Sequence, residues 1–174
     1  MRLVDKALSE IGEPAPEFEL QSNRGEVWRL SENLGTVIAL LFYPKNETLV
    51  CTRQMCSIRD HWNDYLETRA DVIGISPGSV DEHRDFVMNH HLPLPILADP
   101  GGAVTSLYAH HWIWPTVLTR AIVVIDAKGI IRSRRVMLRA FRPTDRSVIT
   151  DIYGARADAM KDQIDAIRKE QSNG

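Results

Sequence analysis

The sequence predicts an α/β protein whose central mixed β-sheet is flanked by helices, and three stretches support this fold class. Residues 36–43 (TVIALLFY) are almost wholly apolar and rich in branched side chains, which suits a central strand buried on both faces. Residues 71–76 (DVIGIS) form a second such run after a helical pattern, so a strand–helix–strand unit is expected. Residues 121–126 (AIVVID) lead through a turn to an extended partner at 130–137, which closes the sheet with a hairpin.

The elements before and between these strands follow from local patterns. Residues 17–20 and 27–30 alternate in polarity around the turn-rich Ser-Asn-Arg-Gly at 22–25, which predicts a hairpin. Apolar residues recur at helical spacing from 51 to 69, so this segment is expected to be one amphipathic helix packed on the sheet. A Pro-Gly turn after residue 76 precedes a helix predicted at 80–90.

The second half of the chain has weaker patterns. Residues 95–98 predict a short extended piece, and residues 102–110 predict a short helix. Residues 144–169 carry apolar positions at helical spacing and are expected to form a helix that breaks near Gly154, because glycine disfavours a helix interior. We assign no chemistry to the C-terminal ~35 residues of the chain, which include this segment.

Length and composition limit the classes of protein that the chain can belong to. Its 174 residues suit one domain, 1–174, with a single core. Hydrophobic residues at 44% and charged residues at 25% are typical of a soluble globular protein, and no run approaches the ~20 apolar residues of a membrane span. The N-terminal segment lacks the apolar run of a secretory signal, so a cytoplasmic location is expected.

The charge balance gives no reason to expect a polyanionic partner. A net charge of −2 does not attract nucleic acid or an anionic membrane, so neither is expected as a partner. One basic cluster stands out, and we interpret it as the solvated face of a β-hairpin and the loop beyond it. The cluster consists of Arg132, Arg134, Arg135, Arg139 and Arg142.

The chain has two cysteines, Cys51 and Cys56, and they lie at the point where a strand is expected to give way to a helix. Two cysteines are too few for a disulfide framework, so a catalytic, redox-sensing or metal-binding role is open. Cys51 lies in the first helical turn, where the helix dipole and unpaired backbone N–H groups favour the thiolate. The thiolate is the nucleophilic form of cysteine.

The residues around the cysteines resemble those of the peroxiredoxins, and specifically of the bacterioferritin-comigratory-protein or peroxiredoxin Q branch. A strand that ends in Phe-Tyr-Pro is followed by Pro-x-x-x-Thr-x-x-Cys, which Pro44, Thr48 and Cys51 match without a gap. Residues 51–56 (CTRQMC) also match the two-cysteine motif of this branch. Further similar stretches, within about the first 135 residues, are GEPAPEFEL at 12–20, LPLPILAD at 92–99 and RAIVVID at 120–126.

This resemblance implies a thioredoxin-like fold and reduction of hydrogen peroxide or organic hydroperoxides without metal, haem or flavin. Cys51 would be the peroxidatic cysteine and Cys56 the resolving one, Thr48 would orient peroxide and thiolate, Pro44 would shield the site, and Arg120 would stabilise the thiolate and the developing negative charge. Thioredoxin or a related thiol reductant is the expected partner. A monomer or a weak homodimer is the expected assembly.

The spacing of the cysteines constrains the resolving step. Residues five apart in an intact α-helix have Cα atoms about 8–9 Å apart, whereas a disulfide requires roughly 4.4–6.8 Å. A bond between Cys51 and Cys56 therefore requires the first helical turns to unwind. The family usually has Pro-Gly just before the first cysteine, where this chain has Leu49 and Val50, so either a less mobile loop or a more apolar pocket entrance is expected.

Three other interpretations of the two cysteines are open. Cys51, Cys56 and His61 could form a structural or copper-handling metal site, although their spacing lies outside the usual zinc motifs. A thioredoxin-type disulfide exchanger would need Cys-x-x-Cys, which is absent. A non-catalytic interaction domain would leave the thiols incidental. We interpret Trp112 and Trp114 as core or lid packing, with pocket lining or a partner surface as the alternatives.

Overall fold

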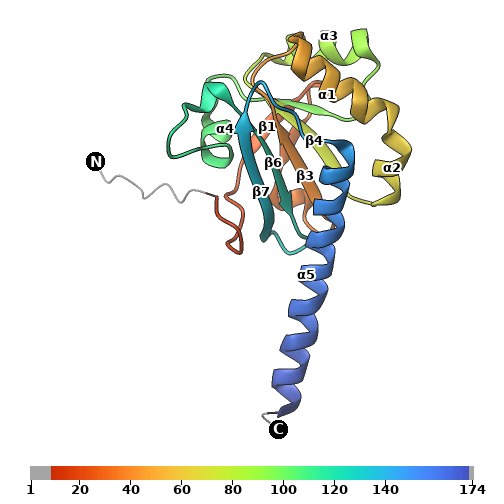
Figure 1. The fold of residues 1–174 in the computed structure, drawn as a ribbon, viewed down its shortest axis with the longest axis vertical. Helices are drawn as coiled ribbons and strands as arrows, with labels where there is room; N and C mark the ends of the chain where they lie inside the picture. The colour runs from red at the N-terminus through yellow and green to blue at the C-terminus, as the bar shows by residue number, and fades with distance from the viewer. Residues whose placement is uncertain (1–8, 173–174) are drawn as a thin grey trace.

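The structure, a computed structural model, describes residues 9–172. Within these residues seven strands form one mixed sheet (Figure 1). In sheet order the strands are β2 (Val27–Arg29), β1 (Glu19–Ser22), β5 (Ile96–Ala98), β4 (Asp71–Ser76), β3 (Ile38–Phe42), β6 (Thr119–Ile125) and β7 (Ile131–Leu138). Strands β3, β4 and β5 are parallel, and the other pairings are antiparallel. The predicted α/β fold with a mixed sheet is confirmed.

Helices cover both faces of the sheet (Figure 1). The helices are α1 (Leu49–Asp60), α2 (Trp62–Glu67), α3 (Val80–His90), α4 (Ala103–Tyr108) and α5 (Asp145–Ser172), with short 3-10 helices at Ser31–Asn33 and Thr116–Leu118. Side chains of β3 point alternately to the two faces, and all five of its residues are buried. One buried cluster joins the sheet to α1, α2, α3 and α5, whereas the other joins it to α4.

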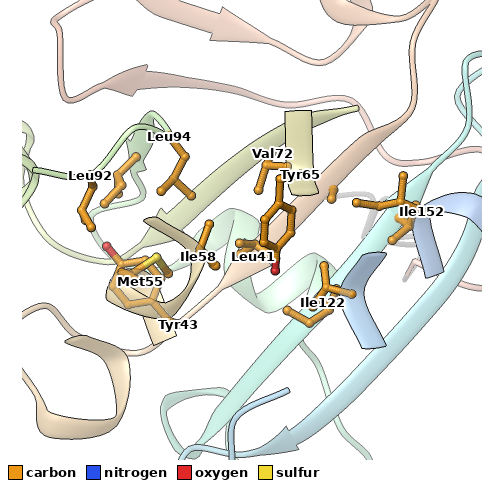
Figure 2. Close-up of a cluster of buried hydrophobic side chains, with 14 of the residues drawn as sticks. Leu41, Tyr43, Met55, Ile58, Tyr65, Val72, Leu92, Leu94, Ile122 and Ile152 are labelled. Carbon is orange, nitrogen blue, oxygen red and sulfur yellow. The ribbon is translucent and has the colours of Figure 1, made fainter. Parts of the chain in front are cut away.

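The first of these clusters fixes α1 against the sheet (Figure 2). Met55 and Ile58 of α1 are fully buried and share the cluster with Leu41 of β3 and Ile122 of β6. Burial of a side chain of this size stabilises the fold by roughly 1.5–3 kcal/mol. The middle of α1 is therefore firmly attached, and this attachment sets the position of the residues at its start.

The segment 51–69 differs from the single helix that its periodicity predicted. Helix α1 begins two residues earlier, at Leu49, and ends at Asp60, after which α2 starts at Trp62. The break is explained by Asp145, at the start of α5, which accepts hydrogen bonds from Ser57 Oγ at 2.5 Å and from Tyr65 Oη at 2.7 Å. For both donors to contact one carboxylate, the helix axis must bend between Ser57 and Tyr65.

Helix α5 was wrongly predicted to break near Gly154, since it runs without interruption from Asp145 to Ser172. Val148, Ile152 and Ala155 are buried against the sheet and hold the helix on both sides of the glycine. A glycine costs a helix interior only about 1 kcal/mol, which this burial exceeds. The C-terminal half of α5 extends beyond the end of the sheet (Figure 1).

Replacing Gly154 with alanine is expected to stabilise the protein. The backbone is helical there, and an added Cβ would meet no atom within 4 Å. We expect the free energy of unfolding to rise by about 0.5–1 kcal/mol, to be measured by urea denaturation. Gly25→Ala is the matched control, because its φ of +86° is strained for alanine, so that variant should lose stability. Equal effects of the two substitutions would contradict this account.

The basic cluster on β7 is not the solvated face that the sequence indicated. Arg132 donates to Asp126 at 2.7 Å and to Asp162 at 2.6 Å, which ties β7 to α5. Arg134 donates to the backbone carbonyl groups of Tyr108 and His110. Burial lowers the pKa of Arg134. Arg135 forms a salt bridge with Asp151 of α5 at 2.6 Å, whereas Arg139 and Arg142 are exposed as predicted.

The remaining predictions differ little from the structure. The hairpin of β1 and β2 is present, although β1 begins at Glu19 rather than at residue 17. The predicted bounds of β4 and α3 agree with the structure, and the hairpin of β6 and β7 is confirmed. Among residues 9–172, no helix is both long and apolar enough to cross a membrane.

Candidate functional site

The candidate site lies where the chain leaves β3 and enters α1. Thr48 is the N-cap of α1, and its Oγ1 accepts a hydrogen bond from the backbone N–H of Cys51 at 3.4 Å. A side-chain cap of this kind satisfies one of the free donors of the first turn. Cys51 therefore lies in the first turn of α1, and it is 1% exposed. Its sulfur receives the favourable field of the helix N-terminus.

Arg120 approaches the same sulfur from the sheet. It lies on β6, one residue before Ala121, which pairs with Phe42 at the end of β3. The side chain is fully buried, its Nη2 donates to Cys51 Sγ at 3.0 Å, and its Nη1 donates to Gln54 Oε1. A buried guanidinium is costly unless it is paired, and a thiolate is a partner of opposite charge. The Nε of Arg120 has no hydrogen-bond partner within the part of the chain that the structure describes.

Gln54 also belongs to the site, although the sequence analysis did not single it out. It appeared there only as one position of the CTRQMC motif. It is 3% exposed and fixes the second nitrogen of the Arg120 fork. Its position three residues after Cys51 places both side chains on one face of α1. A polar residue on the buried face of an amphipathic helix was the available signal.

An apolar pocket of about 760 Å³ opens in front of Cys51. The residues that line it include Pro44, Thr48, Leu49, Val50, Cys51, Thr116, Val117 and Thr119. Pro44, Thr48 and Cys51 therefore share this pocket, and Arg120 lies beside the sulfur. Cys56 is half-buried, and its Sγ lies 4.0 Å from His90 Nδ1 of α3. Both cysteines are free thiols.

A buried polar chain holds the loop before α1 in place. Tyr43 Oη donates to Asn46 Oδ1 at 2.7 Å, and Asn46 Nδ2 lies 2.8 Å from His83 Nδ1. His83 Nε2 lies 3.1 Å from the backbone oxygen of Ser76, so the neutral ring donates there and accepts from Asn46. Burial lowers the pKa of His83. Burial, followed by the negative charge of Cys51, raises the pKa of Tyr43.

Acid is expected to weaken this chain of hydrogen bonds. The unfolded chain binds a proton at His83 with a pKa of about 6.5, whereas the folded chain binds it only at lower pH. The contribution of His83 to the free energy of unfolding is therefore fully present above about pH 6.5. It is lost as the pH falls toward the lowered pKa of His83 in the folded chain. Urea denaturation of wild type and His83→Gln over a pH series measures this, with His91→Asn as control. Parallel curves for wild type and His83→Gln would contradict the assignment.

The two tryptophans and His61, which the sequence singled out, lie outside the contacts around Cys51. Trp112 is 88% exposed, so it does not pack in the core, whereas lid packing stays a prediction. Trp114 stacks on His111 with ring centroids 4.1 Å apart. His61 Nδ1 lies 2.9 Å from the Ser57 carbonyl oxygen and 3.4 Å from Asp145, and no contact joins it to Cys51. Across residues 9–172, no group of three or more His, Cys, Asp or Glu side chains is arranged to hold a metal ion.

Comparison with known proteins yields related sequences and folds. Peroxiredoxin Bcp of Bacillus subtilis (strain 168) is 42% identical over 90 residues, which are 52% of this chain and 57% of that protein. The chloroplastic peroxiredoxin Q of Triticum aestivum is 33% identical over 126 residues, which are 70% of this chain and 56% of that protein. The chain thus spans less than two thirds of the length of these relatives.

Solved structures extend the likeness to the fold. The crystal structure of peroxidoxin BcpB from Mycobacterium tuberculosis is 27% identical with a TM-score of 0.70, and the match covers 86% of this chain and 97% of that one. A 2-Cys peroxiredoxin from Plasmodium vivax, 20% identical with a TM-score of 0.71, shares the fold over 82% of this chain and 79% of its own. The thioredoxin-like fold expected from the sequence is thereby confirmed. Because the family model for AhpC/TSA matches residues 11–134, the chain belongs to the AhpC/TSA family.

Proposed function

We propose that this chain is a thiol-dependent peroxidase that reduces hydrogen peroxide and organic hydroperoxides with Cys51. The observation that carries the proposal is the contact between a fully buried guanidinium and a buried thiol, Arg120 Nη2 to Cys51 Sγ at 3.0 Å, beside an apolar pocket. A cation and a helix N-terminus aimed at one sulfur favour the thiolate, which is the nucleophile. The family and its peroxiredoxin relatives agree with this chemistry.

In the proposed reaction, the Cys51 thiolate attacks the terminal oxygen of the hydroperoxide. An S–O bond forms, the O–O bond breaks, and the departing oxygen takes the electron pair and then a proton to leave as an alcohol or water. The remaining product is a sulfenic acid on Cys51. The negative charge that develops on the departing oxygen is stabilised by preorganised donors, a role that suits Arg120 and Thr48. Pro44 lines the pocket, and its proposed role there is to limit the access of water.

In the second proposed step, Cys56 condenses with this sulfenic acid to form an intramolecular disulfide, which thioredoxin or a related thiol then reduces. The step requires the start of α1 to unwind, because an intact helix holds the two Cα atoms too far apart. Met55 and Ile58 hold the middle of α1 in the core. The unwinding is therefore confined to the residues from Leu49 to about residue 54, and Cys51 moves toward Cys56.

Rapid mixing of the reduced protein with hydrogen peroxide or cumene hydroperoxide tests the proposal. One equivalent of peroxide should be consumed per chain, and intact mass should then show the loss of two hydrogen atoms, as expected for an internal disulfide. Gel filtration of the product should give no larger species than the reduced protein. A reduced protein that consumes no peroxide would overturn the proposed function.

The apolar pocket predicts a preference for alkyl hydroperoxides. Leu49 and Val117 line it, and they are 66% and 67% exposed. Val117→Asp should slow the reaction with cumene hydroperoxide about tenfold, because an apolar substrate would then meet a charge, and should leave the hydrogen peroxide rate nearly unchanged. Val27→Asp, on the edge strand β2, is the control. Equal slowing with both peroxides would contradict this prediction.

The setting in which the protein works is also a proposal. A cycle that ends in reduction by a thiol requires a reducing compartment, which supports the cytoplasm. A monomer or a weak homodimer is the proposed assembly, because the disulfide forms within one chain. Analytical ultracentrifugation of the reduced and oxidised protein measures the assembly directly.

A further inference from the structure

The thiol of Cys56 belongs to a second cluster of polar side chains, separate from the one around Cys51. Its Sγ lies 4.0 Å from Nδ1 of His90, the last residue of α3. The other ring nitrogen of His90, Nε2, lies 3.0 Å and 3.2 Å from the two carboxylate oxygens of Glu47. A carboxylate, an imidazole and a thiol are thus joined in sequence, although they come from three separate segments of the chain.

Several contacts hold the imidazole in this orientation. The edge of the His90 ring packs against the Phe86 ring, with centroids 4.9 Å apart and planes at 65°. Arg59 of α1 donates to the backbone oxygen of His90 at 2.8 Å. Glu47 reaches the ring from a left-handed backbone conformation, with φ of 56°, which a residue other than glycine adopts only at a cost of about 1 kcal/mol. The surrounding structure therefore stabilises an arrangement that the local backbone disfavours.

The geometry determines which nitrogen of the neutral ring can accept a proton. An ionised carboxylate only accepts hydrogen bonds, so the nitrogen facing Glu47 carries the hydrogen, and the lone pair of Nδ1 faces Cys56. A nucleophile within reach of a base that a third group orients is the general pattern of an activated nucleophile. We propose that His90, oriented by Glu47, is the base that accepts the proton of Cys56 in the resolving step. This inference rests on the proposed function.

The step balances without any further reactant. Cys56 transfers its proton to His90 Nδ1, and its thiolate attacks the sulfur of the Cys51 sulfenic acid. An S–S bond forms, the S–O bond breaks, and the departing hydroxide takes a proton from the His90 imidazolium to leave as water. The Cys56 sulfur is oxidised and the Cys51 sulfur is reduced. Because Met55 and Ile58 on either side of Cys56 are buried, Cys56 stays beside His90 while Cys51 approaches.

Separate measurement of the two steps in His90→Gln tests the inference. Stopped-flow mixing gives the rate of peroxide consumption, and alkylation of the remaining thiols at set times, read by intact mass, gives the rate of disulfide formation. We expect an unchanged peroxide step and a resolving step slowed by at least about tenfold, since a positioned base typically contributes a hundredfold or more. His91→Asn, at the neighbouring position with φ of 52°, is the control and should match wild type.

Glu47→Gln provides the second variant. It should slow the resolving step less than His90→Gln does, and the double variant should be no slower than His90→Gln alone, because Glu47 acts through the imidazole. Additive losses, or a resolving step within twofold of wild type in His90→Gln, would overturn the inference. Loss of the peroxide step in wild type would instead overturn the proposed function, so the two failures are distinguishable.

Discussion

Cys51→Ser is expected to abolish hydroperoxide reduction while leaving the fold intact. Serine differs from cysteine by one atom at a site that is 1% exposed, so the packing of α1 changes little. The hydroxyl of serine, unlike a thiol, is not ionised by a neighbouring cation at neutral pH and attacks an O–O bond poorly. Consumption of hydrogen peroxide by the variant should fall to the rate of the buffer, as followed with a peroxide electrode.

Cys56→Ser is the matched variant, since it removes the other thiol of the same helix. It should consume about one equivalent of peroxide at the wild-type rate and then stop as a sulfenic acid, which a dimedone adduct would reveal by mass. Turnover by Cys51→Ser close to that of wild type would assign the reaction to another residue. Opposite behaviour of the two variants would exchange the roles of the two cysteines.

Arg120→Lys is expected to have the second largest effect, a loss of about a hundredfold in the rate of the peroxide step. Arg120 contacts Cys51 and Gln54 with separate nitrogens of one planar fork, and a lysine ammonium cannot keep both contacts in that geometry. Removal of one preorganised donor from a transition state commonly costs about a hundredfold or more. Single-turnover mixing with hydrogen peroxide measures the effect, and far-ultraviolet circular dichroism verifies that the fold is retained.

Arg53→Lys is the control for Arg120. Arg53 lies in α1 only two residues from Cys51, but it is exposed. Its replacement should leave the peroxide rate within twofold of wild type. The same large loss in both variants would show that the effect of Arg120→Lys is not specific to the guanidinium fork beside Cys51.

The sequence predicted the elements that depend on a local pattern and the site residues that belong to the shared motif. The bounds of β4 and α3 follow from an apolar run and from the Pro-Gly turn between them, both of which are local signals. Pro44, Thr48 and Cys51 came from a contiguous motif, and the pocket brings them together. That Arg120 should lie near Cys51 was implied by the resemblance alone, because 69 positions separate them.

The rest depends on contacts between segments that no local pattern encodes. The break after α1 results from Asp145, about 85 positions later, which draws Ser57 and Tyr65 to one carboxylate. The continuity of α5 through Gly154 results from burial against the sheet, which outweighs helix propensity. The Glu47–His90 pair could not be predicted, because it joins a loop to the end of α3 across 43 positions.

The cap of α1 by Thr48 has a consequence for the redox balance of the protein. In the proposed cycle the disulfide forms only after the first turns of α1 have unwound. The free energy that stabilises those turns is therefore present in the reduced protein and lost in the oxidised protein. For a two-electron couple, each kcal/mol lost in this way raises the reduction potential by about 20 mV. A threonine cap contributes about 1 kcal/mol. The hydrogen bond from the Cys51 N–H to Thr48 Oγ1 would therefore make the proposed disulfide a stronger oxidant, which a thiol reductant would reduce more readily.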